Sequence, residues 1–300
     1  MPTGIASLEE TYTAASAAFN TKYQQAYDKA EPVYEQVATV VPSTSLEQGY
    51  GWLDKFPRLK EWIGERQLKA LAGHKYTVKN KELESSVSIE RSEFEDNSYG
   101  QYSPLFAEMG REARLYPDDI VFSLLAAGDT ELCFDGQPFF DSEHPLGGDQ
   151  GLASNIFGEN EAGESWYVLD TSRELKPLIW QNRKDPELVA MLNPNDSNVF
   201  YKNKVDFGVH ARGNAGFGLW QMAAMSKKEL NADNFNEVFL SMTTLKDNEG
   251  SSLRIMPTLL VVPPSLRVKA HEVIKKEKLQ GGESNINFEA VDIMICPYLG

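Results

Sequence analysis

The residues best suited to chemistry in this sequence lie between Cys133 and Pro145, where a thiol, a hydroxyl, several carboxylates and an imidazole lie close together. A cytosolic hydrolase would use Cys133 or Ser142 as nucleophile, His144 as base and Asp141 to orient that base, because a nucleophile needs a base within hydrogen-bond reach and a third group to hold it. Closeness in sequence does not provide this geometry, and a cysteine in an apolar strand is typically inert. We therefore predict no catalytic residues and no enzyme.

The same stretch offers Asp135, Asp141, Glu143 and His144 as metal ligands. The alternate spacing and closing glutamate of a calcium-binding EF-hand are absent, and the histidines do not show the H-x-x-x-H spacing of a helical zinc pair. Residues 213–218 are rich in glycine but match neither of the common nucleotide-binding loops. We therefore predict no metal and no cofactor, and an acidic solvated loop between Cys133 and Pro145.

Composition excludes other classes of protein. The 300 residues hold 29 Lys and Arg against 44 Asp and Glu, a formal net charge of -15. Such a chain is a poor sequence-independent binder of nucleic acid, because Lys and Arg supply most of that affinity. The longest nearly uncharged apolar run, residues 255–266, is shorter than the about 20 residues that cross a bilayer. No basic leader or apolar signal core begins the chain, so we expect a cytosolic protein with no membrane partner.

One amphipathic helix is predicted near the start of the chain. Ser7 and Glu10 form a capping box, and apolar side chains recur every three or four residues until Pro32. Such a stripe must pack on another part of the protein. Its members are Tyr12, Ala15, Phe19, Tyr23 and Tyr27.

Residues 75–94 change to a period of two, which predicts a β-hairpin with its turn at Asn80-Lys81. A two-stranded ribbon is marginal in water by itself. It should therefore lie either on the chain's own core or on a neighbouring subunit. The apolar positions of its strands include Tyr76, Val78, Leu83, Val87 and Ile89.

A longer helix is predicted over residues 103–127. Pro104 lies at the first helical position, Pro117 predicts a kink, and Gly128 ends the helix. At 1.5 Å per residue this rod could reach about 35 Å. After it, a β-rich middle and a small α/β layer are expected. The expected strands are 132–134, 166–169, 177–180, 199–209, 258–262 and 291–295, and the expected helices are 233–245 and 265–278.

One region of the chain leans basic. Its Lys and Arg residues are interleaved with Trp52, Phe56 and Trp62, but Asp54, Glu61 and Glu65 are mixed among them, which disfavours nucleic-acid binding. An arm that contacts an acidic protein surface fits better. The basic residues are Lys55, Arg58, Lys60, Arg66, Lys69, Lys75, Lys79 and Lys81.

Several long blocks of this sequence, in one order, resemble a known family. The block at residues 50–64, which begins Tyr-Gly-Trp-Leu-Asp-Lys-Phe-Pro-Arg, resembles the signature of the protein T family, the major head subunits of bacteriophage Mu and Mu-like prophages. Similarity extends from about residue 50 to residue 300, whereas the first fifty residues match in character more than in letters. The further blocks are 101–111, 133–145, 166–173, 176–179, 216–222, 258–266 and 295–299.

This resemblance implies a fold and an organisation. The fold would be α+β, the Hong Kong 97-type phage capsid fold, also called the Johnson fold. Residues 1–74 would form an N-terminal arm and residues 75–97 an extended β-hairpin loop that lies across the adjacent subunit. Residues 98–225 would form a peripheral domain with the long spine helix and β-rich segments, and residues 226–300 an axial-type α/β domain.

The resemblance also implies a function. The protein would be a major capsid protein that self-assembles into hexamers and pentamers of an icosahedral head around double-stranded DNA, which it contacts only non-specifically. Scaffold and protease, portal and decoration proteins would be partners, with assembly in the bacterial host cytoplasm and a final location in the virion. A prophage-derived protein compartment that encloses cargo would use the same fold, and the hydrolase is the alternative from another class. Residues proposed for subunit contacts are Trp52, Phe56, Trp62, Tyr76, Val78, Leu83, Val87 and Ile89.

Overall fold

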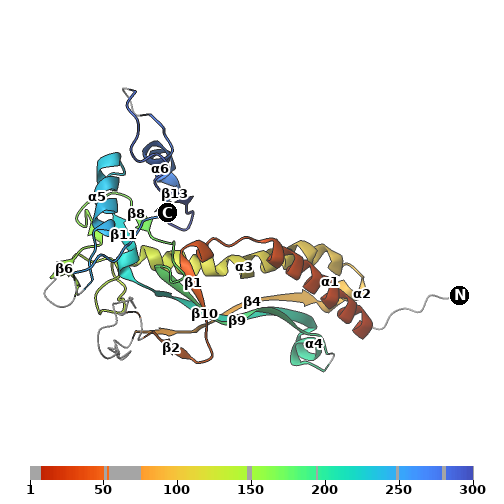
Figure 1. Ribbon diagram of the computed structural model, residues 1–300. Coiled ribbons are helices and arrows are strands. Elements are labelled where there is room, and N and C mark those ends of the chain that lie inside the picture. The colour runs from red at the N-terminus through yellow and green to blue at the C-terminus, as the bar shows by residue number, and fades with distance from the viewer. Residues whose placement is uncertain are drawn as a thin grey trace.

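Helix α3 (Ser103–Ala126) runs alongside a sheet of long strands (Figure 1). Pro104 lies in its first turn, where a missing N–H breaks no hydrogen bond. The helix continues through Pro117, and Asp118 directly after it is buried. The predicted long helix over residues 103–127 is confirmed. The computed structural model describes residues 8–50, 53, 76–146, 151–193, 195–247, 250–278 and 282–299.

Four strands form the sheet beside α3. Strands β9 (Leu178–Met191) and β10 (Lys204–Phe217) are antiparallel and form its centre. Strand β1 (Ala38–Pro42) pairs parallel with β9, and β4 (Lys81–Glu90) pairs antiparallel with β10, so the order is β1-β9-β10-β4. Buried and half-buried residues alternate along β10, which means that one face of the strand packs on the core.

Helix α4 (Ser197–Lys202) connects β9 to β10 at the tip of this sheet. The sequence predicted a strand over residues 199–209, and that prediction is wrong for its first part. The chain has to reverse direction between antiparallel neighbours, and Asn203 helps it to do so in the left-handed conformation, with φ of 56°. Asparagine is one of the few residues that visits this conformation readily.

The predicted hairpin over residues 75–94 is wrong in its pairing. Strand β3 (Thr77–Lys79) pairs with β2 (Glu47–Gly49), whereas β4 pairs with β10. The buried Asn80 separates β3 from β4 and donates a hydrogen bond to the Ser45 carbonyl. Pairing with β10 gives all of β4 a ladder partner and buries its apolar face in a larger sheet, which the three residues of β3 could not do.

Helix α1 (Leu8–Lys29) packs against α3 and confirms the predicted amphipathic helix. The rings of Phe19 and Phe106 stack with centroids 4.0 Å apart. The two backbones approach closely at Gly110, where an added Cβ would lie 2.2 Å from the carbonyl oxygen of Tyr23. Of the predicted stripe, the buried members are Tyr12, Ala15, Phe19 and Tyr23.

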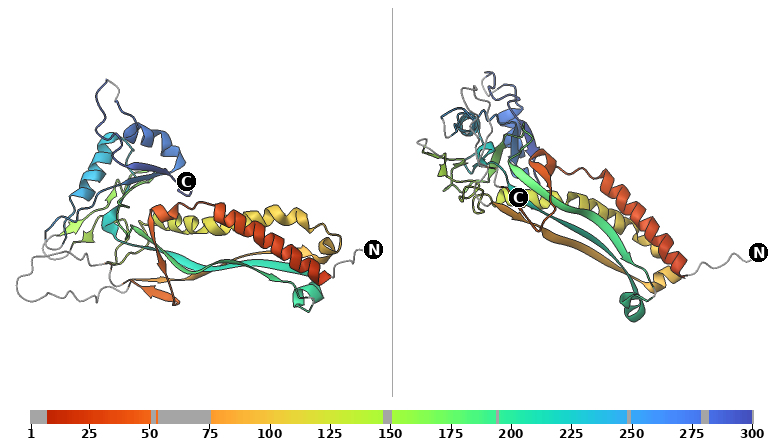
Figure 2. Two further views of the ribbon diagram at one scale, coloured as in Figure 1. Left: turned by 45° about the vertical axis from the view of Figure 1, so that its right-hand side comes forward. Right: turned by 60° about the horizontal axis from the view of Figure 1, so that its bottom comes forward.

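A second sheet, of five strands, forms the other end of the molecule together with two helices (Figure 2). Its elements are β7 (Ile156–Phe157), β8 (Trp166–Leu169), β11 (Ala223–Ser226), β12 (Leu259–Val262) and β13 (Asp292–Ile295), with helices α5 (Ala232–Thr243) and α6 (Arg267–Ile274). The order is β13-β12-β8-β11-β7. The predicted elements after residue 230 are confirmed, although α6 ends four residues early.

The predicted boundary between residues 225 and 226 cuts through this sheet. Strand β8 pairs with β11 on one side and with β12 on the other, so segments from both predicted domains share one set of hydrogen bonds. Strand pairing is non-local, and the sequence on either side of residue 225 carries no sign of it. The α/β part of the molecule therefore begins before the predicted boundary.

Two apolar cores hold these parts together. The smaller core lies among α1, the first half of α3, β4 and β10, and the larger one joins the second half of α3 to the five-stranded sheet. Within the part of the chain described, no helix is long and apolar enough to cross a bilayer. Short elements complete the fold: α2 (Arg91–Glu95), β5 (His144–Pro145), β6 (Leu152–Ala153), η1 (Tyr34–Gln36), η2 (Tyr99–Tyr102), η3 (Trp220–Met222) and η4 (Pro264–Leu266).

Candidate functional sites

A groove of about 710 Å³ opens between α3 and the long sheet. Apolar side chains from both elements line it, among them Leu83 on β4, Leu105 and Met109 on α3, and Val209 on β10. Leu105 is 42% exposed, so part of this apolar surface meets solvent. Leu83, which the sequence predicted to contact another subunit, therefore lies where a partner can reach it.

Acidic side chains dominate the polar lining of the groove. Glu108 and Glu112 on α3 both pair with Arg111, at 3.1 and 2.5 Å, and Glu82 pairs with Arg212 at 3.6 Å. These carboxylates are exposed, so each pair adds little to stability. Their excess negative charge favours a cationic partner. The acidic lining residues are Glu35, Glu82, Glu84, Glu108, Glu112 and Asp185, and the basic ones are Arg114, Lys184 and Arg212.

The other residues predicted for subunit contacts fall into three groups. Val78 and Ile89 are buried in the chain's own core, at 4% and 1% exposure, so the prediction that they contact a neighbour is wrong. The cause is the pairing described above, which places β3 and β4 against the body of their own subunit. Tyr76 and Val87 are half-buried and stay predictions. Trp52, Phe56 and Trp62 lie outside the described residues.

Sequence reasoning missed an exposed aromatic pair. Phe200 and Tyr201 on α4 are 70% and 81% exposed, and their rings make an edge-to-face contact with centroids 5.0 Å apart. Aromatic residues are enriched where proteins contact one another. The signal in the sequence was two adjacent aromatic residues in a polar turn, which the expected strand over residues 199–209 obscured.

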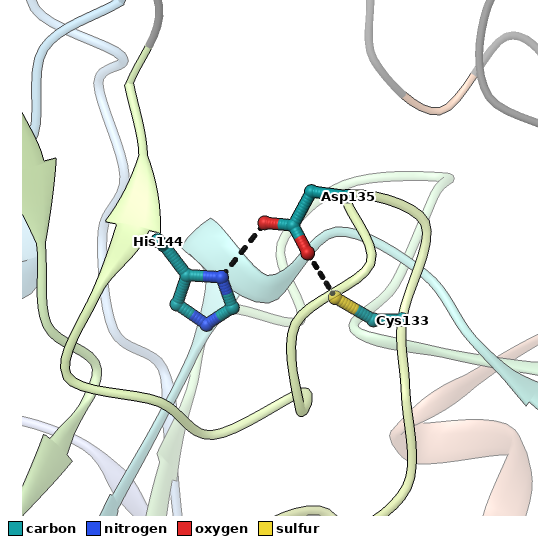
Figure 3. Close-up of side chains that lie close together, drawn as sticks. All are labelled: Cys133, Asp135 and His144. Atoms are coloured by element: carbon teal, nitrogen blue, oxygen red, sulfur yellow. Dashed lines mark hydrogen bonds and ion pairs between the residues drawn. The ribbon is translucent and has the colours of Figure 1, made fainter.

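Cys133, Asp135 and His144 converge in the segment that follows α3 (Figure 3). The Cys133 thiol donates a hydrogen bond to Oδ1 of Asp135 at 3.0 Å, and Oδ2 of Asp135 lies 2.8 Å from Nδ1 of His144. The His144 side chain is fully buried, and that of Asp135 is 8% exposed. Burial would raise the pKa of Asp135, but the hydrogen bonds from His144 and Cys133 hold it below its ordinary value.

This arrangement does not make a nucleophile. Burial, reinforced by the hydrogen bond to Asp135, raises the pKa of the Cys133 thiol, so the sulfur stays protonated and unreactive. In the hydrolase alternative Asp141 would orient the base, but its carboxylate accepts a hydrogen bond from the Glu143 N–H at 2.7 Å, and the His144 ring nitrogens lie next to Asp135 and Phe139 instead. Asp135 bridges the thiol and the imidazole instead. In the sequence, the position of Asp135 two residues after Cys133 was the signal that could have indicated a contact between these two side chains.

Comparison with known proteins identifies the family. The family model described as Mu-like prophage major head subunit gpT matches residues 12–299. The major capsid protein of Escherichia phage Mu is 39% identical over 287 residues, which cover 92% of this chain and 94% of that protein. The Mu-like prophage FluMu major head subunit of Haemophilus influenzae is 40% identical over 267 residues, with coverage of 86% and 87%.

Solved structures share the fold. A chain of the bacteriophage JBD30 procapsid matches with a TM-score of 0.86 and 45% identity, over 96% of this chain and 98% of that one. A chain of the JBD30 capsid matches with a TM-score of 0.78 and 34% identity, over 90% and 92%. The α+β, Hong Kong 97-type capsid fold is thereby confirmed. The chain belongs to the Mu-like prophage major head subunit family, and it is a structural capsid protein rather than an enzyme.

Proposed function

We propose that copies of this chain assemble into hexamers and pentamers, which close an icosahedral head around double-stranded DNA. The observation that supports this subunit contact is the opposite charge of the groove and of residues 54–75. Six acidic and three basic residues line the groove, whereas residues 54–75 contain six Lys and Arg against three Asp and Glu. Opposite charges of this kind steer association and set its register.

In the proposed contact, residues 52 and 54–74 of one subunit lie on the groove of the next, whereas Tyr50 and Leu53 are buried in the core of their own subunit. Trp52, Phe56 and Trp62 would cover the apolar wall formed by α3 and β10, and their large rings would supply most of the buried area. Lys55 and Arg58 would face the acidic rim. This assigns the contact to the aromatic segment and to Leu83, in place of the buried Val78 and Ile89.

Charge reversal tests this contact. Glu82→Lys together with Glu84→Lys changes two exposed rim residues on β4 without altering the core. We expect this variant to keep the wild-type urea unfolding curve but to lose rings and shells, as seen by light scattering and negative-stain microscopy with coexpressed scaffold. Glu159→Lys, an exposed reversal away from the groove, is the matched control and should assemble normally.

A second reversal makes the test specific. Adding Lys55→Glu and Arg58→Glu to the rim variant restores opposite charges and should restore assembly. If the rim variant assembles like the wild type, the groove is not the contact. If the wild-type chain stays monomeric at high concentration even with scaffold, the shell proposal itself fails.

The enclosed DNA should be held only weakly. The net charge of -15 opposes tight phosphate binding, and a wall that does not adsorb DNA leaves it free to be packed and released. We expect no band shift with double-stranded DNA at about 0.15 M salt, where screening limits long-range attraction. Tight, sequence-independent binding under these conditions would contradict the proposal.

Part of the organisation expected from the resemblance is kept in this proposal, without the hairpin pairing of residues 75–97 and with the α/β part beginning before residue 226. Within the arm expected over residues 1–74, α1 and β1 pack on their own subunit, so the basic, aromatic residues after β2 are the part proposed to contact a neighbour. The axial-type part would lie nearest the centre of each ring. Scaffold and protease, a portal and decoration proteins would join assembly in the bacterial host cytoplasm. Copurification of these proteins with early particles is the corresponding measurement, and particles that form from this chain alone would show that scaffold is dispensable.

A further inference from the structure

We propose that Cys133, Asp135 and His144 form a binding site for a thiophilic divalent cation such as Zn²⁺. One ligand atom from each residue, the sulfur, a carboxylate oxygen and Nδ1, lies within 4.8 Å of the other two. Thiolate, carboxylate and imidazole are the ligand types that zinc takes in proteins. The proposal is independent of how the subunits contact one another.

Both ring nitrogens of His144 lie next to acceptor oxygens. Oδ2 of Asp135 lies 2.8 Å from Nδ1, and the Phe139 carbonyl oxygen lies 3.3 Å from Nε2. In the proposed site Nε2 donates its N–H to the Phe139 carbonyl, and Nδ1, the ring nitrogen beside the Asp135 carboxylate, binds the cation. A histidine that ligates a metal commonly donates its other N–H to a backbone carbonyl in this way.

Charge balance also favours a divalent ion. A thiolate, a carboxylate and a neutral imidazole around a divalent cation sum to zero, which is the least costly state for a buried site. Binding would displace the thiol proton of Cys133 to solvent, and the neutral imidazole of His144 would bind through Nδ1 with its N–H on Nε2. The three residues fill three of four tetrahedral positions. A water molecule or the second carboxylate oxygen can take the fourth, because Asp135 keeps 8% of its side chain exposed.

Neighbouring groups hold each ligand in place. The Trp220 ring stacks on the His144 ring, with centroids 4.0 Å apart and planes 6° from parallel. The Gln137 N–H donates to Oδ1 of Asp135 at 3.1 Å, and the Cys133 N–H donates to the Gln137 carbonyl at 2.8 Å. Such outer contacts orient ligands and raise metal affinity. The segment between α3 and β5 has little regular structure, so an ion here would fasten it.

Cobalt provides a direct readout, because Co²⁺ bound by a thiolate absorbs through sulfur-to-cobalt charge transfer. The full-length chain, freed of metal with a chelator, is titrated with Co²⁺ alone. We expect a near-ultraviolet charge-transfer band that saturates at one ion per chain and disappears when Zn²⁺ is added. Cys133→Ser should lose the band, whereas Cys296→Ser, which changes the other buried thiol, should keep it.

Two further variants and one stability measurement complete the test. Asp135→Asn and His144→Gln should each weaken Co²⁺ binding by more than the about 10- to 100-fold that loss of an outer-shell partner already causes. If Cys133→Ser does not fold, the melting temperature of the wild-type chain is measured with and without Zn²⁺. A rise in melting temperature with Zn²⁺ that a chelator reverses supports the proposed site. A wild-type chain without the band, or an unchanged band in Cys133→Ser, would overturn the proposal.

Discussion

Gly110→Ala should loosen the packing of α1 on α3. An added Cβ would lie 2.2 Å from the carbonyl oxygen of Tyr23 and 2.9 Å from its carbonyl carbon, closer than real Cβ atoms approach. Both atoms belong to the backbone of α1, so no side-chain rotation can relieve the overlap. The helix has to move away, which also disturbs the stacked rings of Phe19 and Phe106.

The expected magnitude follows from two opposing effects. Overpacking in a close-packed contact costs about 1–3 kcal/mol. Alanine in place of glycine within a helix returns about 1 kcal/mol through its higher helix propensity. Docking of α1 should therefore weaken by up to about 2 kcal/mol, which corresponds to an opening equilibrium up to about 30-fold larger.

Hydrogen exchange measures this opening directly. Amides of α1 in Gly110→Ala should exchange faster than in the wild type, by up to about 30-fold, because local opening exposes them. Gly100→Ala is the matched control, since a Cβ there meets no atom within 4 Å, and its exchange should match the wild type. If α1 in Gly110→Ala exchanges at the wild-type rate or more slowly, the close approach does not limit packing and the reasoning is refuted.

Three other predictions concern single buried or half-buried side chains. Ile89→Ala should lower the free energy of unfolding by about 2–5 kcal/mol, because it leaves a cavity in the core. Leu83→Ala should leave the urea unfolding curve near that of the wild type but impair shell formation, as measured by light scattering. The reverse pattern would place Ile89 between subunits. Asn155→Ala should lower the free energy of unfolding by at least about 1–3 kcal/mol in the same assay. It removes the Asn155 amide, which accepts from the Asp141 N–H at 2.9 Å and donates to the Phe139 carbonyl at 2.8 Å. Wild-type stability in this variant would show that water replaces the amide. Burial raises the pKa of Asp118 above its ordinary value of 3.8 in the folded state. The stability that the protonated Asp118 contributes is therefore fully present below pH 3.8 and is lost as the pH rises through the folded-state pKa. Over this range the wild type should lose stability relative to Asp118→Asn in urea unfolding, and parallel pH curves would contradict the burial effect.

Helices that bury one face could be predicted because their signal is local. The apolar spacing in α1 and the Pro104 start of α3 lie within a few turns of chain, so their positions follow from neighbouring residues. The order of long sequence blocks likewise identified the family without any contact in space. The net charge of -15 and the basic, aromatic segment before residue 75 are also properties of the chain alone.

Strand partners and the convergence of side chains required the tertiary structure. A strand with alternating apolar residues, such as β4, can form its backbone hydrogen bonds with any neighbouring strand. Three partners were available to β4, namely β3, β10 and a strand of another subunit, and its pairing with β10 places Ile89 in the chain's own core. In the same way, both Asp135 and Asp141 lie close to His144 in sequence, but the path of the loop brings only the carboxylate of Asp135 to the imidazole. Sequence therefore determined the local elements and the family, whereas long-range packing decided which faces are free for assembly, because that choice depends on residues far apart in the chain.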